Sequence, residues 1–327
     1  MNNNIPFLLL PAVKDYLWGG TRLNDDFNLN IDIAPFAEAW VCSTHPDGSS
    51  TTTYGESLID VLHSHPEYLG THPLSTMNGK SELPILIKLI DAKKDLSVQV
   101  HPDDAFAREH ENGQLGKTEM WYVLNAKPDS SLVYGFNQDV NKAQVRDGVA
   151  NGTIEQLLNH VPIHKNDLFY IEAGTVHAIG AGALIAEIQE SSNLTYRLYD
   201  YNRVDKNGNT RPLHIEKALN VANLKSSAMP RQPMRVLKYN NGCASELLTR
   251  CKYFQVERLL LNTEGRQMPE FQTKSNSFHA LLIVDGCGVL FGDGLSLYFF
   301  KGDCIFVPAD SIPLHLHGKA QLLNVSC

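Results

Sequence analysis

The stretch Asp95-Leu96-Ser97-Val98-Gln99-Val100-His101 alternates apolar and polar side chains. Because successive side chains of a β-strand point to opposite faces of a sheet, this alternation predicts a strand with two unlike faces. The apolar face would carry Leu96, Val98 and Val100, and the polar face Ser97, Gln99 and His101. A buried strand rarely tolerates three polar side chains on one face, so we expect this face to line a site.

Further strand patterns lie on both sides of this stretch. Apolar, β-branched or aromatic runs predict strands at 84–90, 120–124 and 168–171. Beyond residue 235, short runs of this kind are separated by turns that contain glycine, which is typical of an all-β sandwich or barrel. We therefore expect a mainly β fold.

A change in composition divides the chain. The segment 225–233 is typical of a linker, which predicts a first domain over residues 1–228 and a second over 235–327. Helical segments are expected only in the first domain. They should lie at about 55–70, 102–112, 138–160 and 212–223, with the third made of two helices separated by Asn151-Gly152.

Composition excludes several classes of function. The 327 residues have a net charge of −8 and contain no dense basic run, which argues against nucleic acid as a partner. No stretch approaches the roughly 18 apolar residues that a membrane helix needs, and no signal peptide is expected. The six cysteines form no CxxC pair. We interpret them as reduced thiols of a cytoplasmic protein. We expect the protein to be a monomer or a homodimer.

Two more segments carry groups that bind metals. His177 ends the turn Gly174-Thr175-Val176-His177, and Glu119 ends Gly116-Lys117-Thr118-Glu119. With Gln99 and His101 they offer two imidazoles, a carboxylate and an amide oxygen, a set suited to catalytic zinc. The alternative is that His101 caps the helix that follows Pro102 and that His177 is a hydrogen-bonded core residue. The combination of three segments favours the metal.

The two halves share a weak repeat. Residues 165–174 resemble residues 301–310, and both read as a polar turn, a strand and a tight turn. Where the first copy continues to His177, the second has Pro313, so we expect the second barrel to lack the metal ligands. His315 and His317 lie close to Pro313 in the sequence, so a second metal site remains an alternative there.

Several segments of the chain resemble those of a known family. Leu96-Ser97-Val98-Gln99-Val100-His101-Pro102-Asp103-Asp104 is similar to the signature of type I phosphomannose isomerases, which are zinc enzymes with a cupin fold. Other segments agree in the same order: Trp18-Gly19-Gly20, Glu38-Ala39-Trp40, Gly116–Glu119, Ala173–Ala178 and Asn193–Asp200. Glu172 departs from the proline that is usual there. The resemblance implies a bicupin, two jelly-roll β-barrels, with a helical insertion in the N-terminal half.

The resemblance also implies an activity and its cofactor. The chain would interconvert mannose 6-phosphate and fructose 6-phosphate by proton transfer between C1 and C2 through an enediol. One Zn²⁺ per chain would be held by Gln99, His101, Glu119 and His177. The zinc would act as a Lewis acid that stabilises the developing oxyanion.

Glu187 is the residue that we expect to act as the base. It lies ten residues before Arg197, and apolar neighbours predict that burial raises its pKa toward that of a useful base. Lys117 and His177 remain alternatives, Glu190 is a weaker one, and Glu187 could instead be a surface carboxylate. Arg197 resembles the family's active-site arginine and would stabilise the enediolate or orient the substrate.

Other residues are expected to bind the sugar phosphate. Ser97 and Arg203 match positions that contact phosphate in the family, although Arg203 could also be a solvated loop residue. Lys88 is charged within an apolar strand and therefore needs a partner, which favours a role in the site. Trp18 could form a wall of the pocket or belong to the core.

Two other functions would fit a pocket of this kind. One is a different metal-dependent cupin enzyme, such as an iron dioxygenase, whose sites favour histidines with a carboxylate. The other is a non-enzymatic bicupin that binds sugars. Gln99 as a ligand and the arginines near 200 argue for the isomerase.

Overall fold

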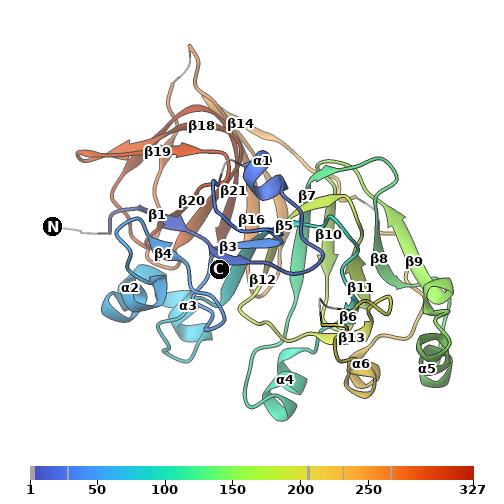
Figure 1. Cartoon of the computed structure of the whole chain (residues 1–327). Helices are drawn as coiled ribbons and strands as arrows, with labels where there is room; N and C mark the ends of the chain where they lie inside the picture. Colours follow the sequence, from blue (N-terminus) through green and yellow to red (C-terminus); the bar gives the residue numbers. More distant parts are fainter. Residues whose placement is uncertain (1–3, 28, 205–206, 231, 266) are drawn as a thin grey trace.

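The computed structural model describes residues 4–27, 29–204, 207–230, 232–265 and 267–327. As predicted, the fold is mainly β, and the described strands form three antiparallel sheets (Figure 1). The six-stranded sheet has the order β10-β7-β12-β5-β3-β2. Its strands are β2 (Ala12–Lys14), β3 (Glu38–Cys42), β5 (Ile85–Asp91), β7 (Glu119–Ala126), β10 (Leu168–Ile171) and β12 (Ala183–Glu190).

The second sheet, of five strands, completes the N-terminal barrel. Its order is β13-β6-β11-β8-β9. Its strands are β6 (Val98–Val100), β8 (Ser131–Phe136), β9 (Leu158–Pro162), β11 (His177–Ile179) and β13 (Tyr196–Tyr199). Trp121, Phe169 and Ile185 of the six-stranded sheet pack against Leu132 and Ile179 of the five-stranded sheet. This cluster is the barrel's interior, and the polar site lies beside it.

The third sheet forms the C-terminal barrel. Its strands after residue 235 are β14 (Lys238–Asn240), β15 (Cys243–Arg250), β16 (Gln255–Asn262), β17 (Glu270–Phe271), β18 (His279–Gly292), β19 (Leu295–Phe300), β20 (Cys304–Val307) and β21 (Leu314–Ser326). Two strands from the N-terminal half join it, β1 (Phe7–Leu10) and β4 (Thr51–Thr52), and β1 pairs with β20. The chain therefore covers the β20 edge with its own first strand, so the halves are not separate in space as they are in sequence.

The helices lie in several separate connections. They are α1 (Arg22–Asp25), α2 (Leu58–Ser64), α3 (Thr71–Thr76), α4 (Asp104–His110), α5 (Lys142–Ala150) and α6 (Ile215–Val221), with 3₁₀ turns η1 (Pro66–Leu69) and η2 (Ile154–Leu157). A single helical insertion is therefore not confirmed. Among the described residues, no helix is long and apolar enough to cross a membrane.

Two local predictions were wrong. The helix expected over 153–160 is only the turn η2, after which β9 begins at Leu158 and pairs with β8. Leu158 and Val161 are buried in different apolar clusters, and a strand can place them on opposite faces. Leu96 precedes β6 and joins the inner cluster, whereas Val98 and Val100 face the outer one. The alternation therefore holds only from residue 97 onward.

The two barrels share one apolar interface. The outer face of the six-stranded sheet, with Ile87 and Met120, packs in one cluster with Phe278 and Phe306 of the C-terminal barrel. Phe278 and Phe306 are fully buried, and their rings stack with centroids 5.2 Å apart. The C-terminal barrel thus forms the surface on which the sheet that carries Glu119 and Glu187 rests.

This packing predicts a large effect of Phe278→Ala on stability. Removing a fully buried ring leaves a cavity and should lower the free energy of unfolding by about 3–5 kcal/mol in urea denaturation. Tyr298→Ala is the control, because its side chain is 68% exposed, and it should change stability by less than about 0.5 kcal/mol. Equal effects of both changes would contradict this account of the interface.

Candidate metal centre and active site

Strand register brings part of the site together in the five-stranded sheet. Arg197 of β13 lies opposite Gln99 of β6, and Gln99 lies opposite His177 of β11. His101 follows β6 directly, so its side chain is on the same face as Gln99. An arginine, an amide and two imidazoles therefore lie in one row across three strands.

Two of these groups, the imidazoles of His101 and His177, meet Glu119, the first residue of β7. Nε2 of His177 lies 3.1 Å from Nε2 of His101 and 3.3 Å from Oε1 of Glu119. His101 Nε2 lies 3.7 Å from Glu119 Oε2. One ligand atom from each of the three residues lies within 4.8 Å of the others, and all three side chains are buried. The structure thus brings together predicted ligands from three distant segments.

The donor atoms of this cluster fit a cation. Nδ1 of His177 lies 2.8 Å from the carbonyl oxygen of Thr175, so it donates there and leaves the Nε2 lone pair facing the cluster. Burial lowers the pKa of His177 to about 4 and that of His101 well below its ordinary value, so both imidazoles are neutral. Glu119 Oε1 accepts no hydrogen bond from any described residue. A metal ion would fill these unused acceptor positions.

Gln99 lies at the edge of this cluster. Its amide Nε2 is 3.4 Å from Nε2 of His177. Rotating the amide by half a turn would present Oε1 to the same position, so the side chain is within reach of a shared ion.

The C-terminal barrel has no equivalent centre among its described residues. His317 Nδ1 lies 2.7 Å from the Thr263 hydroxyl, and the His315 ring packs against Phe291. Within the described ranges, the only group of three side chains that could hold a metal ion is the one in the N-terminal barrel.

The six-stranded sheet contributes a second row of polar groups. Register places Trp121 of β7 opposite Glu187 of β12, Glu187 opposite Lys88 of β5, and Lys88 opposite Trp40 of β3. The indole of Trp121 donates to Glu187 Oε2 at 2.9 Å. The Trp40 indole donates to Glu38 Oε2 at 2.6 Å. Both tryptophans therefore fix the carboxylates from the side.

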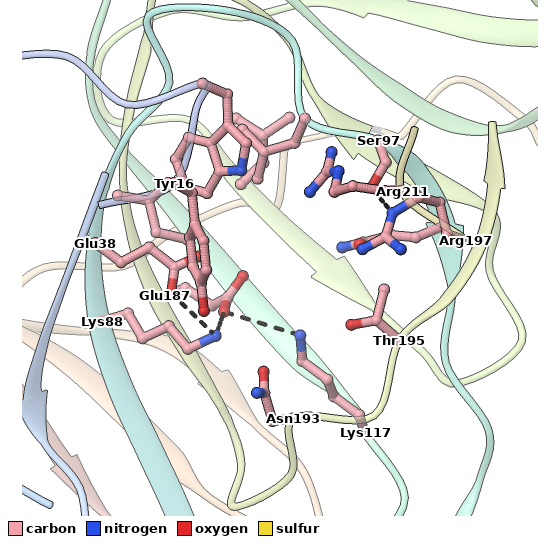
Figure 2. Close-up of a pocket in the computed structure, with 15 residues that line it drawn as sticks. Tyr16, Glu38, Lys88, Ser97, Lys117, Glu187, Asn193, Thr195, Arg197 and Arg211 are labelled. Atoms are coloured by element: carbon pink, nitrogen blue, oxygen red, sulfur yellow. Dashed lines mark hydrogen bonds and ion pairs between the residues drawn. The ribbon is translucent and has the colours of Figure 1, made fainter. Parts of the chain in front are cut away.

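Five buried charges alternate in sign through the site. Lys117 Nζ lies 2.8 Å from Glu119 Oε2 and 4.0 Å from Glu187 Oε1. Lys88 Nζ lies 3.0 Å from Glu187 Oε1 and 3.8 Å from Glu38 Oε2. Lys88 therefore has the charged partners that we expected for a lysine within an apolar strand. Figure 2 shows Lys88 and Lys117 both directed at Glu187.

These neighbours reverse one expectation about Glu187. Burial alone would raise its pKa, as expected from the sequence, but Lys88 and Lys117 outweigh burial and lower the pKa to about 2. Burial would lower the pKa of Lys88, yet Glu187 and Glu38 raise it above its ordinary value. Glu119 behaves differently, because burial and the nearby Glu187 raise its pKa to about 7 despite Lys117. Glu187 is therefore ionised at neutral pH.

A cavity of about 310 Å³ opens onto these groups. Seven of the residues proposed from the sequence line it, and Figure 2 shows how several of them face one another. Those lining the cavity are Trp18, Lys88, Ser97, Gln99, Lys117, Glu187 and Arg197, and the buried His177 lies beside Gln99. The cavity volume is at the lower end of the range for small-molecule sites.

Arg203 does not line this cavity, and its expected contact with phosphate stays a prediction. Its guanidinium binds the carboxylate of Asp200 and the carbonyl oxygen of Asp95. Arg211 lines the cavity instead and also binds Asp200, with Nε 2.8 Å from Oδ2. Asp200 therefore joins the two arginines, and only Arg211 reaches the main cavity.

Sequence reasoning missed several lining residues. They are Tyr16, Glu38, Asn193, Thr195 and Arg211. Glu38, Asn193 and Thr195 lie inside motifs that had been noted for their likeness to the family, which could have marked them. Arg211 lies between the turn near 208 and Pro212, and no local pattern separates it from an exposed loop residue.

Comparisons with known proteins decide the family. Residues 7–134 match the family described as phosphomannose isomerase type I, catalytic domain, and residues 245–327 match the mannose-6-phosphate isomerase cupin domain. A mannose-6-phosphate isomerase of Bacillus subtilis is 33% identical over 322 residues, which cover 97% of this chain and 98% of that protein. The chain belongs to the type I phosphomannose isomerase family.

Other members agree in sequence and in fold. A mannose-6-phosphate isomerase of Streptococcus mutans is 40% identical over 228 residues, covering 68% of this chain and 69% of that one. The crystal structure of mannose 6-phosphate isomerase from Bacillus subtilis superposes with a TM-score of 0.88 at 33% identity and covers 99% of both chains. A mutant of phosphomannose isomerase from Salmonella typhimurium, at 19% identity and a TM-score of 0.75, shares the fold. The cupin architecture expected from the sequence is thus confirmed.

The alternating charges predict the effect of Lys88→Met. The change leaves Glu187 and Glu38 buried without their shared cation, so the free energy of unfolding should fall by about 3–5 kcal/mol in urea denaturation at pH 7. Adding Glu187→Gln to Lys88→Met removes one stranded charge and should restore part of the loss. A single variant as stable as the wild type would contradict the role given to this ion pair.

Proposed function

We propose that this protein is a zinc-dependent aldose–ketose isomerase that interconverts mannose 6-phosphate and fructose 6-phosphate. The observation that carries the proposal is a buried His101–Glu119–His177 cluster directly beside a cavity that the ionised Glu187 lines. Relatives of similar sequence, one of them matched over 98% of its length, bear the same activity in their names. That agreement favours an isomerase over a dioxygenase or a non-enzymatic sugar-binding protein.

In this proposal His101, Glu119 and His177 hold the zinc through nitrogen and oxygen donors, and Gln99 adds its amide oxygen. When bound, zinc supplies a Lewis acid that stabilises negative charge on the substrate oxygens at C1 and C2. The Thr175 carbonyl keeps His177 in the tautomer that a ligand needs. Glu119 brings a negative charge that offsets part of the ion's charge.

Glu187 takes the carbon-bound proton in this account. It is ionised, and the Trp121 indole and Lys88 hold both of its oxygens in place. A carboxylate with a low pKa is a weak base, so the transfer depends on alignment with the sugar and on a stabilised enediolate. His177 is a poor alternative, because one ring nitrogen binds Thr175 and the other faces the cluster. Lys117 remains an alternative base only in its neutral form; as the ammonium group that contacts Glu119 and Glu187, it would instead return a proton to the enediolate oxygen.

The phosphate would occupy the opposite end of the cavity. Arg197, Arg211, Ser97 and Thr195 gather there, away from Glu187 and Lys88 (Figure 2). Arg197 Nε donates to the Ser97 hydroxyl at 3.2 Å, so the hydroxyl and the guanidinium already form one polar surface. Guanidinium groups bind phosphate oxygens in a planar fork. Binding the phosphate here would fix C1 and C2 near the metal end.

A pair of variants tests the division between metal ligand and base. His101→Ala should lose zinc and activity together, since it removes a ligand. Glu187→Gln should keep one zinc per chain but lower kcat by 100-fold or more, which is the usual contribution of a positioned base. Zinc content by mass spectrometry and exchange of the C2 proton of mannose 6-phosphate with solvent are the measurements. Near-normal exchange in Glu187→Gln would show that another group is the base.

The phosphate end is tested with Arg211→Gln and the matched control Arg203→Gln. Both arginines bind Asp200, but only Arg211 lines the main cavity. Arg211→Gln should raise KM for mannose 6-phosphate at least tenfold and weaken inhibition by inorganic phosphate, with kcat within about threefold. Arg203→Gln should change KM by less than threefold. The reverse order would return the phosphate to Arg203, the residue favoured by the family resemblance.

A further inference from the structure

One contact of the C-terminal barrel reaches toward the metal centre. Tyr253 lies in the turn between β15 and β16, and its hydroxyl donates to Asp104 Oδ2 at 2.9 Å. Lys252 Nζ, on an exposed side chain, lies 3.1 Å from the same oxygen. Asp104 is the first residue of α4, which begins three residues after His101. The second barrel therefore binds the start of the helix that follows a metal ligand.

The other oxygen of Asp104 holds the loop 116–118. The backbone N–H of Gly116 donates to Asp104 Oδ1 at 3.1 Å, and that of Lys117 donates to the Pro102 carbonyl oxygen at 3.0 Å. A Cβ on Gly116 would lie 2.5 Å from the nitrogen of Asp104, so the loop packs directly against the start of α4. Only glycine allows this approach.

A buried carboxyl secures the rest of the loop. Glu190 is 1% exposed, and its Oε1 accepts from the backbone N–H of Thr118 at 2.7 Å. Burial and the nearby Asp104 raise the pKa of Glu190 to about 8, so it is a neutral acid at pH 7 that can donate to Asp104. Three successive N–H groups of the loop are thus held by Asp104, Pro102 and Glu190.

This loop carries two groups of the active site. The side chain of Lys117 leaves it toward Glu187, and Glu119 follows it directly, with Lys117 Nζ 2.8 Å from Glu119 Oε2. The loop's anchors therefore set where a metal ligand and its neighbouring cation lie. We propose that Tyr253, acting through Asp104, is a positioning residue by which the C-terminal barrel holds the loop 116–118 and the metal ligand Glu119 in place.

This inference rests on the proposed function, since it concerns the same metal centre. It gives the C-terminal barrel, which has no ligand cluster of its own among the described residues, a part in catalysis. Groups that orient metal ligands from outside typically change metal affinity by 10–100-fold when they are removed. The hydroxyl of Tyr253 acts one step further out, through Asp104, so the lower end of that range is expected.

Tyr253→Phe tests the inference, with Tyr122→Phe as the matched control. The Tyr122 hydroxyl also joins the two barrels, since Arg258 Nη1 and Gln321 Nε2 donate to it at 3.0 and 2.9 Å. Its side chain lies in the interface cluster with Met120, on the face of β7 opposite Trp121. Each variant removes one hydroxyl between the barrels, but only Tyr253→Phe removes one that reaches the loop.

Two measurements on the zinc-loaded protein give the result. Zinc release to a chelator should be about tenfold faster in Tyr253→Phe, and the amides of Gly116, Lys117 and Thr118 should exchange with deuterium about tenfold faster. Tyr122→Phe should stay within twofold of the wild type in both. Wild-type rates in Tyr253→Phe, or equal acceleration by the two variants, would overturn the inference.

The exchange measurement does not depend on the sugar chemistry. If the wild-type protein bound no zinc or failed to isomerise mannose 6-phosphate, the proposed function would fall. Amide exchange of the loop in the two variants would still decide whether Tyr253 holds it. The failure of one proposal is therefore distinguishable from the failure of the other.

Discussion

The site depends on keeping several charges inside a β-barrel. Glu119, Lys117, Glu187, Lys88 and Glu38 form a series of alternating sign, in which each carboxylate or ammonium lies within 4.0 Å of the next. All five residues are less than 10% exposed, so none of their charges would be stable there without the oppositely charged neighbours. The series ends on Glu119, whose Oε1 faces the neutral imidazole of His177 and whose Oε2 faces that of His101. A cation bound at that end would offset the remaining negative charge.

The layered sheets make this series possible. The six-stranded sheet carries the charged row on its inner face and rests with its outer face on the apolar core of the C-terminal barrel. Antiparallel register then fixes which side chains are neighbours, since Trp121, Glu187, Lys88 and Trp40 lie in one row across four strands. The five-stranded sheet adds Arg197, Gln99 and His177 in a similar row. Strand register therefore places most groups of the candidate site, and the loop before β7 adds Lys117.

How much the sequence could predict follows from the range of the interactions. Local alternation was enough to find Gln99 and His101, and a charge inside an apolar strand was enough to mark Lys88. The low pKa of Glu187 was not predictable from its neighbours in sequence, because Lys88 and Lys117 approach it from 99 and 70 residues away. Arg211 was not predictable either, because its place at the cavity, where it also binds Asp200, follows from tertiary structure. Similarly, β1 joins the C-terminal sheet through a pairing of residues almost 300 apart, which no local pattern encodes.

The most direct measurement of the central claim is a crystal structure of the protein grown with zinc, with diffraction recorded on both sides of the zinc absorption edge. The account predicts one anomalous peak per chain, about 2.0–2.2 Å from Nε2 of His101, Nε2 of His177 and a carboxylate oxygen of Glu119. It also predicts that the Gln99 amide turns its oxygen toward that peak. Absence of a peak at this position, or a zinc ion bound elsewhere with these side chains unchanged, would contradict the account.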